Sequence, residues 1–195
     1  MPQFPSLPQI AGLGDLFKLF PGFAGHLLEY TDGVMRGPGE LSLGERELIA
    51  SYVSGLNACK FCDDSHLIYA EAFGIEKGVM EALLSDLEAA SVADELKPLL
   101  AYAKKLNTLP STMVPADAQA ILDSGWNEET LFCVIQICAL FNLFNRLVEG
   151  SGVNFDYMEN AENHPATTQP REEMSHSYRD FALRLGLIGS QPTGE

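Results

Sequence analysis

The sequence predicts an all-α fold built as a single domain over residues 1–195. Along most of the chain, apolar residues recur three and four positions apart, which is the spacing of a buried helix face. No segment shows the two-residue alternation of a strand, and proline or glycine separates the helical stretches. Hydrophobic residues make up 46% of the sequence, which is enough for a full core.

The N-terminal part predicts an extended lead followed by two helices. Residues 1–12 contain three prolines and are expected to be extended. Helices are expected over Asp15 to Phe20 and over Gly22 to Met35. The run Arg36-Gly37-Pro38-Gly39 then breaks the helical pattern.

The next helix is expected to begin at Ser42, because Ser42 and Glu45 form a capping-box pattern. Its apolar stripe consists of Leu48, Ile49, Tyr52, Val53 and Leu56. Glu47 lies on this helix. Each residue turns about 100° around the axis, so Glu45 lies about 200° away from Glu47. Only one of these two carboxylates can face a given neighbour.

A further helix is expected over residues 61–73, ended by Gly74, with a Cys-x-x-Cys pair at its start. Cys59, Cys62 and His66 are spaced i, i+3, i+7 and can therefore lie on one side. The unpaired N–H groups and the dipole of a helix N-terminus favour a thiolate over a thiol. The neighbouring Asp63-Asp64 opposes this effect, because it places negative charge beside the sulfur atoms.

Glu47 can reach the cysteines only if the chain turns between them. The twelve residues from Glu47 to Cys59 would span about 18 Å on one straight helix. A turn near Gly55-Leu56-Asn57 would bring the two together, and Asn57 could either end the first helix or cap the second.

The rest of the chain predicts five more helices. They are expected over Glu76 to Ala90, Ala93 to Leu106, Ala116 to Leu122, Glu128 to Glu149 and Ser175 to Leu185. Pro115 suits a helix start, and Asn127 can cap the longest helix. Glu159 to Glu173 is poor in apolar residues and predicts a loop or arm, while Gly189 to Glu195 is expected to fray.

These elements predict four parts within the one domain. The extended lead covers residues 1–12 and the core covers 13–155. A loop or arm follows over 156–174, and a C-terminal helix with a frayed tail ends the chain over 175–195.

The longest predicted helix carries a polar stripe, formed by Asn142, Asn145, Arg146 and Glu149. The stripe is either the solvent face or a buried polar seam that faces the cysteine pair or another subunit. A helix that is apolar around most of its circumference is usually buried, which favours burial in an oligomer. Cys133 and Cys138 lie on the same helix but five residues apart, and both are expected to be small core residues.

Charge and cysteine usage exclude several classes of partner and location. The chain has 12 basic and 27 acidic residues, a net charge of −15, which argues against binding to nucleic acid or to anionic membranes. No secretion signal opens it, and the apolar run from Leu131 to Leu143 is too short and too polar to span a bilayer. Four cysteines in such a chain predict a reducing, cytoplasmic location.

The residues around the cysteine pair resemble the alkylhydroperoxidase D family of the carboxymuconolactone decarboxylase-like superfamily. The resemblance runs through Arg46-Glu47-Leu48-Ile49, Val53 to Cys62, and His66. In the branch of peroxidase-related proteins it also covers Leu41 to Glu47 and Phe141 to Leu147. It spans most of residues 10–155, and the spacing of glutamate, cysteine pair and histidine is specific.

The resemblance implies an AhpD-like multi-helix domain and a thiol peroxidase with antioxidant activity. Cys62 corresponds to the peroxidatic thiol, Cys59 to the resolving thiol, and Glu47 and His66 to the proton relay. The implied partners are a hydroperoxide and a dithiol reductant, with no cofactor and no metal. The implied assembly is a trimer or hexamer, with a dimer also open. One departure is Phe61, which stands where well-studied members have a second histidine and either reduces the relay or makes the pocket more apolar.

Three other interpretations of the cysteine pair remain open. The same scaffold could carry a different small-molecule reaction, with Glu47 and His66 as acid and base. A metal-binding or interaction module could use Cys59, Cys62 and His66 with His164 or His176 as a fourth ligand. Structural zinc sites usually combine two close ligand pairs, however, and the sequence has only one. Finally, the cysteines could form a structural disulfide or be inert buried thiols.

Overall fold

The computed structural model describes residues 1–189 and confirms the all-α prediction. Within these residues there are ten α-helices, three short 3-10 segments and no strand. Residues 190–195, where most of the frayed end is expected, lie outside the described residues. The α-helices are α1 Leu13–Leu19, α2 Ala24–Arg36, α3 Leu43–Leu56, α4 Lys60–Ala72, α5 Val79–Ser85, α6 Leu96–Thr108, α7 Pro115–Asp123, α8 Glu128–Ser151, α9 Pro165–Thr168 and α10 Ser177–Arg184; the 3-10 segments cover Pro110–Thr112, Ala161–Asn163 and Arg171–Met174.

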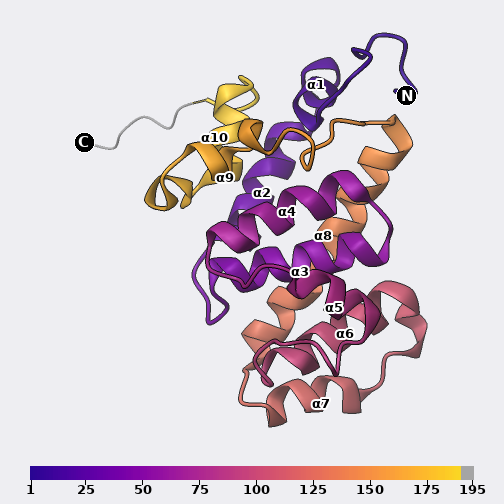
Figure 1. Ribbon diagram of the computed structural model, residues 1–195, viewed down its shortest axis with the longest axis vertical. Helices are drawn as coiled ribbons and strands as arrows, with labels where there is room; N and C mark the ends of the chain where they lie inside the picture. Colours follow the sequence, from indigo (N-terminus) through magenta and orange to yellow (C-terminus); the bar gives the residue numbers. More distant parts are fainter. Residues whose placement is uncertain (190–195) are drawn as a thin grey trace.

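The helices are arranged around a central pair formed by α3 and α4 (Figure 1). The long helix α8 passes behind this pair and packs against α2, α3 and α6. Helices α5, α6 and α7 lie at one end of the molecule, and α1, α9 and α10 lie at the other. Helix α10 packs on α2, so the C-terminal segment returns to the N-terminal part of the fold.

Helices α3 and α4 form an antiparallel hairpin, which places Glu47 of α3 beside α4, the helix that begins with the cysteine pair. Two polar contacts give the register: Ser51 Oγ donates to the Asp63 side chain at 2.5 Å, and Glu47 meets His66. The expected capping box at Ser42 is present, with the Glu45 N–H donating to Ser42 Oγ at 3.2 Å. Helix α3 ends at Leu56 and α4 begins at Lys60. The turn that brings Glu47 close to α4 therefore lies at the end of the expected stretch Gly55-Leu56-Asn57 and directly after it.

The turn between α3 and α4 is a Schellman motif in which Cys59 takes part. The Cys59 N–H donates to the Ser54 carbonyl at 3.0 Å, and the Ala58 N–H donates to the Gly55 carbonyl at 2.9 Å. Ala58 has a φ of 54°, a left-handed conformation that usually falls to glycine and costs an alanine about 1–2 kcal/mol. Cys59 then serves as the N-cap of α4, so the cysteine pair lies at a helix N-terminus as predicted.

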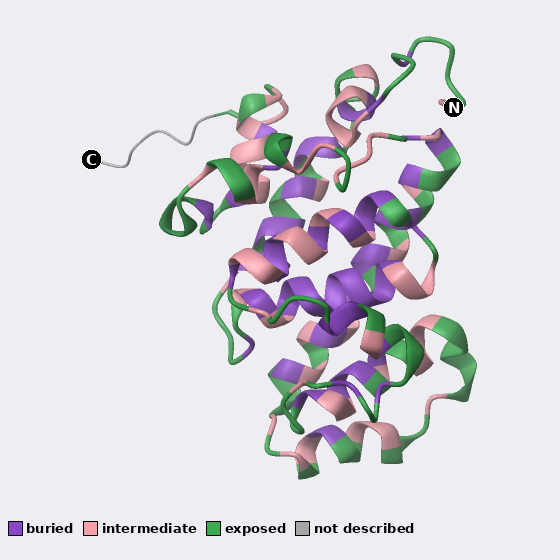
Figure 2. Ribbon diagram, viewed as in Figure 1, coloured by how far each residue is buried: buried purple, intermediate pink, exposed green. Residues whose placement is uncertain are grey.

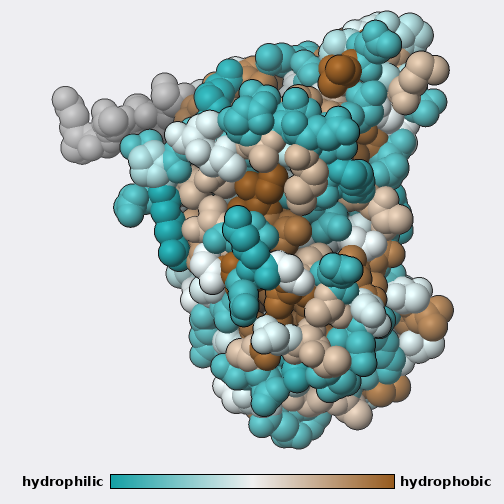
Figure 3. Space-filling model, in the orientation of Figure 1, coloured by the Kyte–Doolittle hydropathy of each residue, from teal (hydrophilic) through white to brown (hydrophobic). Residues whose placement is uncertain are grey.

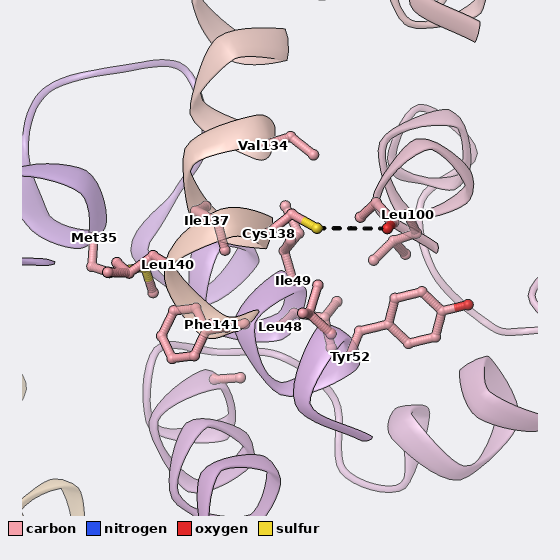
Figure 4. Packing of buried hydrophobic residues seen from close by; sticks show 14 of the residues in the cluster. Met35, Leu48, Ile49, Tyr52, Leu100, Val134, Ile137, Cys138, Leu140 and Phe141 are labelled. Carbon is pink, nitrogen blue, oxygen red and sulfur yellow. Dashed lines mark hydrogen bonds between the residues drawn. The ribbon is translucent and has the colours of Figure 1, made fainter. Parts of the chain in front are cut away.

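The main core lies where α8 crosses α3, α6 and α2. Figure 4 shows side chains of α8, among them Ile137 and Cys138, beside Leu48 and Ile49 of α3, with the Cys138 sulfur directed toward α6. Figure 2 shows that α3 is buried over nearly its whole length, whereas the outer helices bury one side. Ten of the fourteen α3 residues are buried, so its charged members must find partners inside the protein.

Two predicted helices differ from those observed. The helix expected over Glu76 to Ala90 is only Val79–Ser85, and the next helix begins at Leu96 rather than at Ala93. Asp86 explains the early end, because its side chain accepts the Glu88 N–H at 3.0 Å. Such a local side-chain bond competes with the helical hydrogen-bond pattern and favours a turn.

The N-terminal lead and the arm both bury side chains against the bundle. In the lead, Leu7 and Ala11 are buried, and Asn154 accepts the Ala11 N–H at 2.8 Å. In the arm, His164 and Met174 are both 1% exposed. The arm contains α9 and two 3-10 segments, so short helical turns replace the loop expected there.

The polar stripe of α8 contains both buried and exposed side chains, and Asn142 is partly buried. Asn145 is buried; it accepts a hydrogen bond from the Asn57 side-chain amide at 2.8 Å and donates one to Ser54 Oγ at 3.0 Å. Arg146 and Glu149 are exposed. Of the two cysteines on this helix, Cys138 is buried as predicted. Cys133 is only half-buried, which corrects the expectation that both belong to the core.

Helix α8 is long and apolar enough to cross a membrane by length and composition alone. Its 24 residues have a mean hydropathy of 1.8 in the most apolar window, of which 44% is buried inside the protein. The sequence argument considered only residues 131–143, and the helix proves to be longer. Its contacts with α2, α3 and α6 make it the central core helix of this fold.

The face of the molecule that is seen in Figure 3 is mostly hydrophilic, with hydrophobic atoms gathered toward its middle.

Candidate active site

A cavity of about 440 Å³ opens beside α4 and is bounded by α1, α2, α8 and the C-terminal segment. Its walls are rich in aromatic side chains, among them Phe61, Tyr69, Phe141, Phe144, Tyr157 and Tyr178. Because these side chains come from α4, α8, α10 and the arm, the site is complete only when the C-terminal part is folded onto the bundle.

The two thiols of the cysteine pair have different surroundings. Cys62 lines the cavity, whereas Cys59 is fully buried behind it, and both are free thiols. The hydrogen bond to Cys62 and, next, burial hold the pKa of the Cys59 thiol far above its ordinary range. Cys59 is therefore a protonated thiol in direct contact with Cys62.

Glu47 and His66 form the buried polar contact on which a proton relay would depend. The distance from His66 Nδ1 to Glu47 Oε2 is 2.5 Å, and the Glu47 side chain is completely buried. Glu47 is ionised, so it accepts, and His66 carries its proton on Nδ1. Whenever the ring is neutral, the other ring nitrogen, Nε2, is therefore its basic atom. Phe141 packs edge-on against this ring at 4.3 Å between centroids.

Arg36 keeps Glu47 ionised in the protein interior. Its Nη2 donates to Glu47 Oε1 at 2.5 Å, and both side chains are completely buried. Burial alone would raise the pKa of Glu47, but the charge of Arg36 and then that of His66 lower it to about 2. A buried ion pair of this kind is tolerated only when its remaining hydrogen bonds are satisfied.

The remaining donors of Arg36 are satisfied by the C-terminal segment and by its own helix. Arg36 Nε donates to the Met174 carbonyl and to Ser177 Oγ, both at 3.2 Å. Its guanidinium carbon lies 4.8 Å from the ring centre of Tyr178 and 5.1 Å from that of Phe73. These cation–π contacts partly replace the water that the charge loses on burial.

Tyr178 joins the Glu47 carboxylate from α10. Its hydroxyl donates to Glu47 Oε1 at 3.0 Å and lies 3.4 Å from His66 Nδ1. Burial, and then the negative charge of Glu47, raise the pKa of Tyr178 well above its ordinary value. The hydroxyl therefore stays protonated and acts as a donor.

His164 enters the cavity from the arm and is held neutral. Its ring packs edge-on against Tyr69 at 4.5 Å and against Tyr157 at 4.9 Å between centroids. Burial, and next the proximity of His66, lower the pKa of His164 to about 4. Glu47 acts in the opposite direction but does not outweigh burial.

The lowered pKa of His164 predicts a loss of stability in mild acid. Unfolding frees the ring to bind a proton below its ordinary pKa of 6.5, so the unfolded state gains protons first. The contribution of His164 is fully present above pH 6.5, falls as the pH decreases toward 4, and amounts to at most about 3 kcal/mol. Urea unfolding between pH 7 and pH 4.5 measures it. His164→Gln should lose less stability over this interval than the wild type, and equal losses would contradict the prediction.

The structure brings together all four residues singled out from the sequence. Cys59 and Cys62 lie at the turn end of the α3–α4 hairpin, and Glu47 contacts His66 farther along it. Cys62 and His66 line the cavity, whereas Cys59 is buried and does not. Glu45 is on another side of α3 and only caps its N-terminus. Phe61 lies in the cavity wall, 5.2 Å from Tyr157 between ring centroids.

The ligand sets considered for a metal do not form. His176 lies at Asp32, with Nδ1 at 2.8 Å from the carboxylate, and its side chain is 63% exposed. Across residues 1–189, no group of three or more histidine, cysteine, aspartate or glutamate side chains is arranged to hold an ion. The metal-binding interpretation therefore has no geometric support in this part of the chain.

Sequence reasoning missed Arg36 and Tyr178, and it considered His164 only as a possible metal ligand. Arg36 falls in the run taken as a helix break, but it is the last residue of α2 and its side chain turns inward. Tyr178 and His164 lie more than 90 residues beyond the cysteine pair. Local periodicity carries no signal for such contacts. The one available hint is that a buried carboxylate on α3 requires a cationic partner.

A family model and a curated relative each match part of the chain. Residues 21–105 match the carboxymuconolactone decarboxylase family. Over 102 residues, or 52% of this chain and 69% of the relative, the sequence is 28% identical to the uncharacterized protein YdfG of Bacillus subtilis (strain 168).

Two solved structures show the same fold. One is an uncharacterized peroxidase-related protein from Ralstonia eutropha JMP134, described as an alkylhydroperoxidase AhpD core. Its TM-score is 0.68 and its sequence identity 23%, and the match covers 72% of this chain and 74% of the Ralstonia chain. The other is an uncharacterized peroxidase-related protein from Silicibacter sp. TM1040, with a TM-score of 0.65, 19% identity, and coverage of 73% and 74%.

Proposed function

We propose that this chain is a thiol-dependent peroxidase, because residues 21–105 match the carboxymuconolactone decarboxylase family and the chain has the AhpD-like fold. The observation that carries the proposal is the position of Cys62. This thiol lines the cavity one helical turn before His66, whose Nδ1 is bound to the ionised Glu47, and it contacts the protonated thiol of Cys59.

The first step of the proposed reaction oxidises Cys62. His66 Nε2 accepts the thiol proton, and the thiolate attacks the terminal oxygen of a hydroperoxide. An S–O bond forms as the O–O bond breaks, and the sulfur becomes a sulfenic acid. The alkoxide that leaves takes up the proton held by His66, so the hydroperoxide is reduced to an alcohol. Glu47 stabilises the imidazolium that forms in between.

The second step closes the disulfide. The Cys59 sulfur attacks the sulfenic sulfur of Cys62, the S–S bond forms, and the hydroxyl leaves as water with the proton of the Cys59 thiol. A dithiol donor then reduces the disulfide and becomes oxidised itself. Because its pKa is raised, Cys59 keeps its proton until it attacks, and this proton leaves with the water.

We expect one equivalent of cumene hydroperoxide to convert Cys59 and Cys62 into an intramolecular disulfide. Two free thiols and two hydrogen atoms should be lost, as measured by thiol titration and intact mass, while Cys133 and Cys138 stay free. Peptide mapping locates the bond. A wild-type protein that consumes no hydroperoxide would rule out the proposed function, and a major disulfide containing Cys133 or Cys138 would rule out the assigned pair.

A second candidate function is proton transfer on a small organic molecule, with Glu47 and His66 as acid and base. It is favoured by Tyr178, which extends this pair into a three-residue hydrogen-bonded set beside a cavity of about 440 Å³. Such a reaction does not need the cysteines. It would persist in Cys62→Ser, whereas peroxide reduction would not.

Assembly and location are part of the same proposal. We propose a homo-oligomer, either a trimer or a hexamer, with a dimer as the alternative. The support is an apolar strip on α8 that leaves Phe132 59% and Leu143 45% exposed. We propose a cytoplasmic location, because a catalytic thiol pair requires a reducing compartment to return to its active form.

A further inference from the structure

One face of α4 directs four side chains into the cavity. Cys62, Ser65, His66 and Tyr69 are spaced i, i+3, i+4, i+7, and all four line it. The hydroxyl of Ser65 therefore lies one turn along the helix from the Cys62 thiol, in the same space as a bound substrate. Nothing in the relay of Glu47 and His66 uses this hydroxyl.

The hydrogen bonds of His164 determine which way the Ser65 hydroxyl is oriented. His164 Nδ1 accepts the Ala166 N–H at 3.1 Å, so this nitrogen carries no proton. A neutral imidazole must then carry its proton on Nε2, which lies 3.0 Å from Ser65 Oγ. His164 is therefore the donor and Ser65 Oγ the acceptor in this contact. Since the pKa of His164 is lowered to about 4, the arrangement persists at neutral pH.

The proton of the Ser65 hydroxyl remains available to the cavity. The contact with His164 is the one hydrogen bond of the Ser65 side chain within residues 1–189. An oxygen that accepts from a fixed N–H turns its own proton away from that donor. The ring of His164 is in turn held between Tyr69 and Tyr157, so the donor cannot easily turn away.

We propose that Ser65, oriented by His164, donates a hydrogen bond to the leaving oxygen of the hydroperoxide while Cys62 attacks the terminal oxygen. This inference rests on the proposed peroxidase function and deepens it. Residues three apart on a helix have Cβ atoms about 5–6 Å apart, and a reacting oxygen lies about 3–3.5 Å from the sulfur. The leaving oxygen then falls within hydrogen-bonding distance of Ser65.

The hydrogen bond stabilises charge that develops only during the reaction. As the S–O bond forms and the O–O bond breaks, the leaving oxygen becomes an alkoxide, which His66 then protonates. Ser65 keeps its own proton throughout and lowers the energy of the alkoxide, as donors of an oxyanion hole do. His164 acts as a positioning residue, because it touches Ser65 and not the reacting atoms.

The leaving group provides a test that separates this role from a structural one. An alkoxide leaving from tert-butyl hydroperoxide needs the donor, whereas the carboxylate leaving from peracetic acid is already stable. Stopped-flow measurement should find Ser65→Ala about 10- to 100-fold slower with tert-butyl hydroperoxide and less than about 3-fold slower with peracetic acid. His164→Phe should show the same selectivity with a smaller loss. Thr108→Ala, which removes an exposed hydroxyl on α6, is the control and should leave both rates unchanged.

Each result decides the inference. Selective loss with the alkyl hydroperoxide supports it in either variant. Equal losses with both oxidants, or no loss with either, would overturn it while the wild type still reacts. If the wild type reacts with neither oxidant, the proposed peroxidase function itself has failed, and that outcome is distinct from a failure of the role of Ser65.

Discussion

Cys62→Ser should abolish oxidation by hydroperoxide, whereas Cys59→Ser should still react once. The structural reason is access: Cys62 lines the cavity, and Cys59 is fully buried behind it. Without Cys59, the sulfenic acid on Cys62 has no neighbouring thiol to close a disulfide, so excess peroxide should drive it to the sulfinic acid. Stopped-flow kinetics and intact mass after a stoichiometric and an excess dose of peroxide distinguish the two variants.

The matched control is Cys133→Ser, which removes a half-buried cysteine on α8, outside the cavity. This variant should form the disulfide at the wild-type rate and with the wild-type stoichiometry. The assigned roles would be reversed if Cys59→Ser were inert and Cys62→Ser accumulated a sulfenic acid on Cys59. Oxidation of Cys62→Ser by hydroperoxide at the full rate would show that Cys62 is not the thiol that reacts with the peroxide.

Glu47→Gln should slow the oxidation of Cys62 by about 10²- to 10⁴-fold, the usual contribution of a positioned acid–base group. The neutral amide of the new glutamine cannot stabilise the imidazolium of His66. Because an amide can donate as well as accept, it also no longer requires His66 to carry its proton on Nδ1. The neighbouring Glu45→Gln should leave the rate unchanged, because the Glu45 side chain only accepts the Ser42 N–H, which glutamine can also do. Equal losses in the two variants would contradict the assignment.

Glu47→Gln should also destabilise the protein, and this effect has to be separated from the chemistry. Removing one member of a buried ion pair leaves Arg36 uncompensated and costs about 3–5 kcal/mol. Arg36→Met combined with Glu47→Gln leaves no unpaired charge and should recover much of that stability in urea unfolding. The double variant should nevertheless remain slow. A rate that recovers along with stability would make the role of Glu47 purely structural.

The parts of the fold that depend on local physics could be predicted from the sequence. The capping box at Ser42, the glycine stop at Gly74 and the Asn127 cap each act within a few residues and were correctly located. The shared face of Cys62 and His66 follows from the helical period alone. The predicted helix over Glu76 to Ala90 was too long, because apolar spacing does not register the side-chain bond of Asp86 that ends it at Ser85.

The sequence by itself therefore determined the helices and the order of chemical groups along α3 and α4. Only the tertiary structure decided the environment of those groups. Arg36, Tyr178 and His164 reach the site from α2, α10 and the arm, and together they keep Glu47 ionised, set the proton of His66 on Nδ1 and orient Ser65. Helix caps and periodicity act between neighbours in the chain, whereas a charge buried among aromatic side chains must be balanced by whatever the fold brings within about 3 Å.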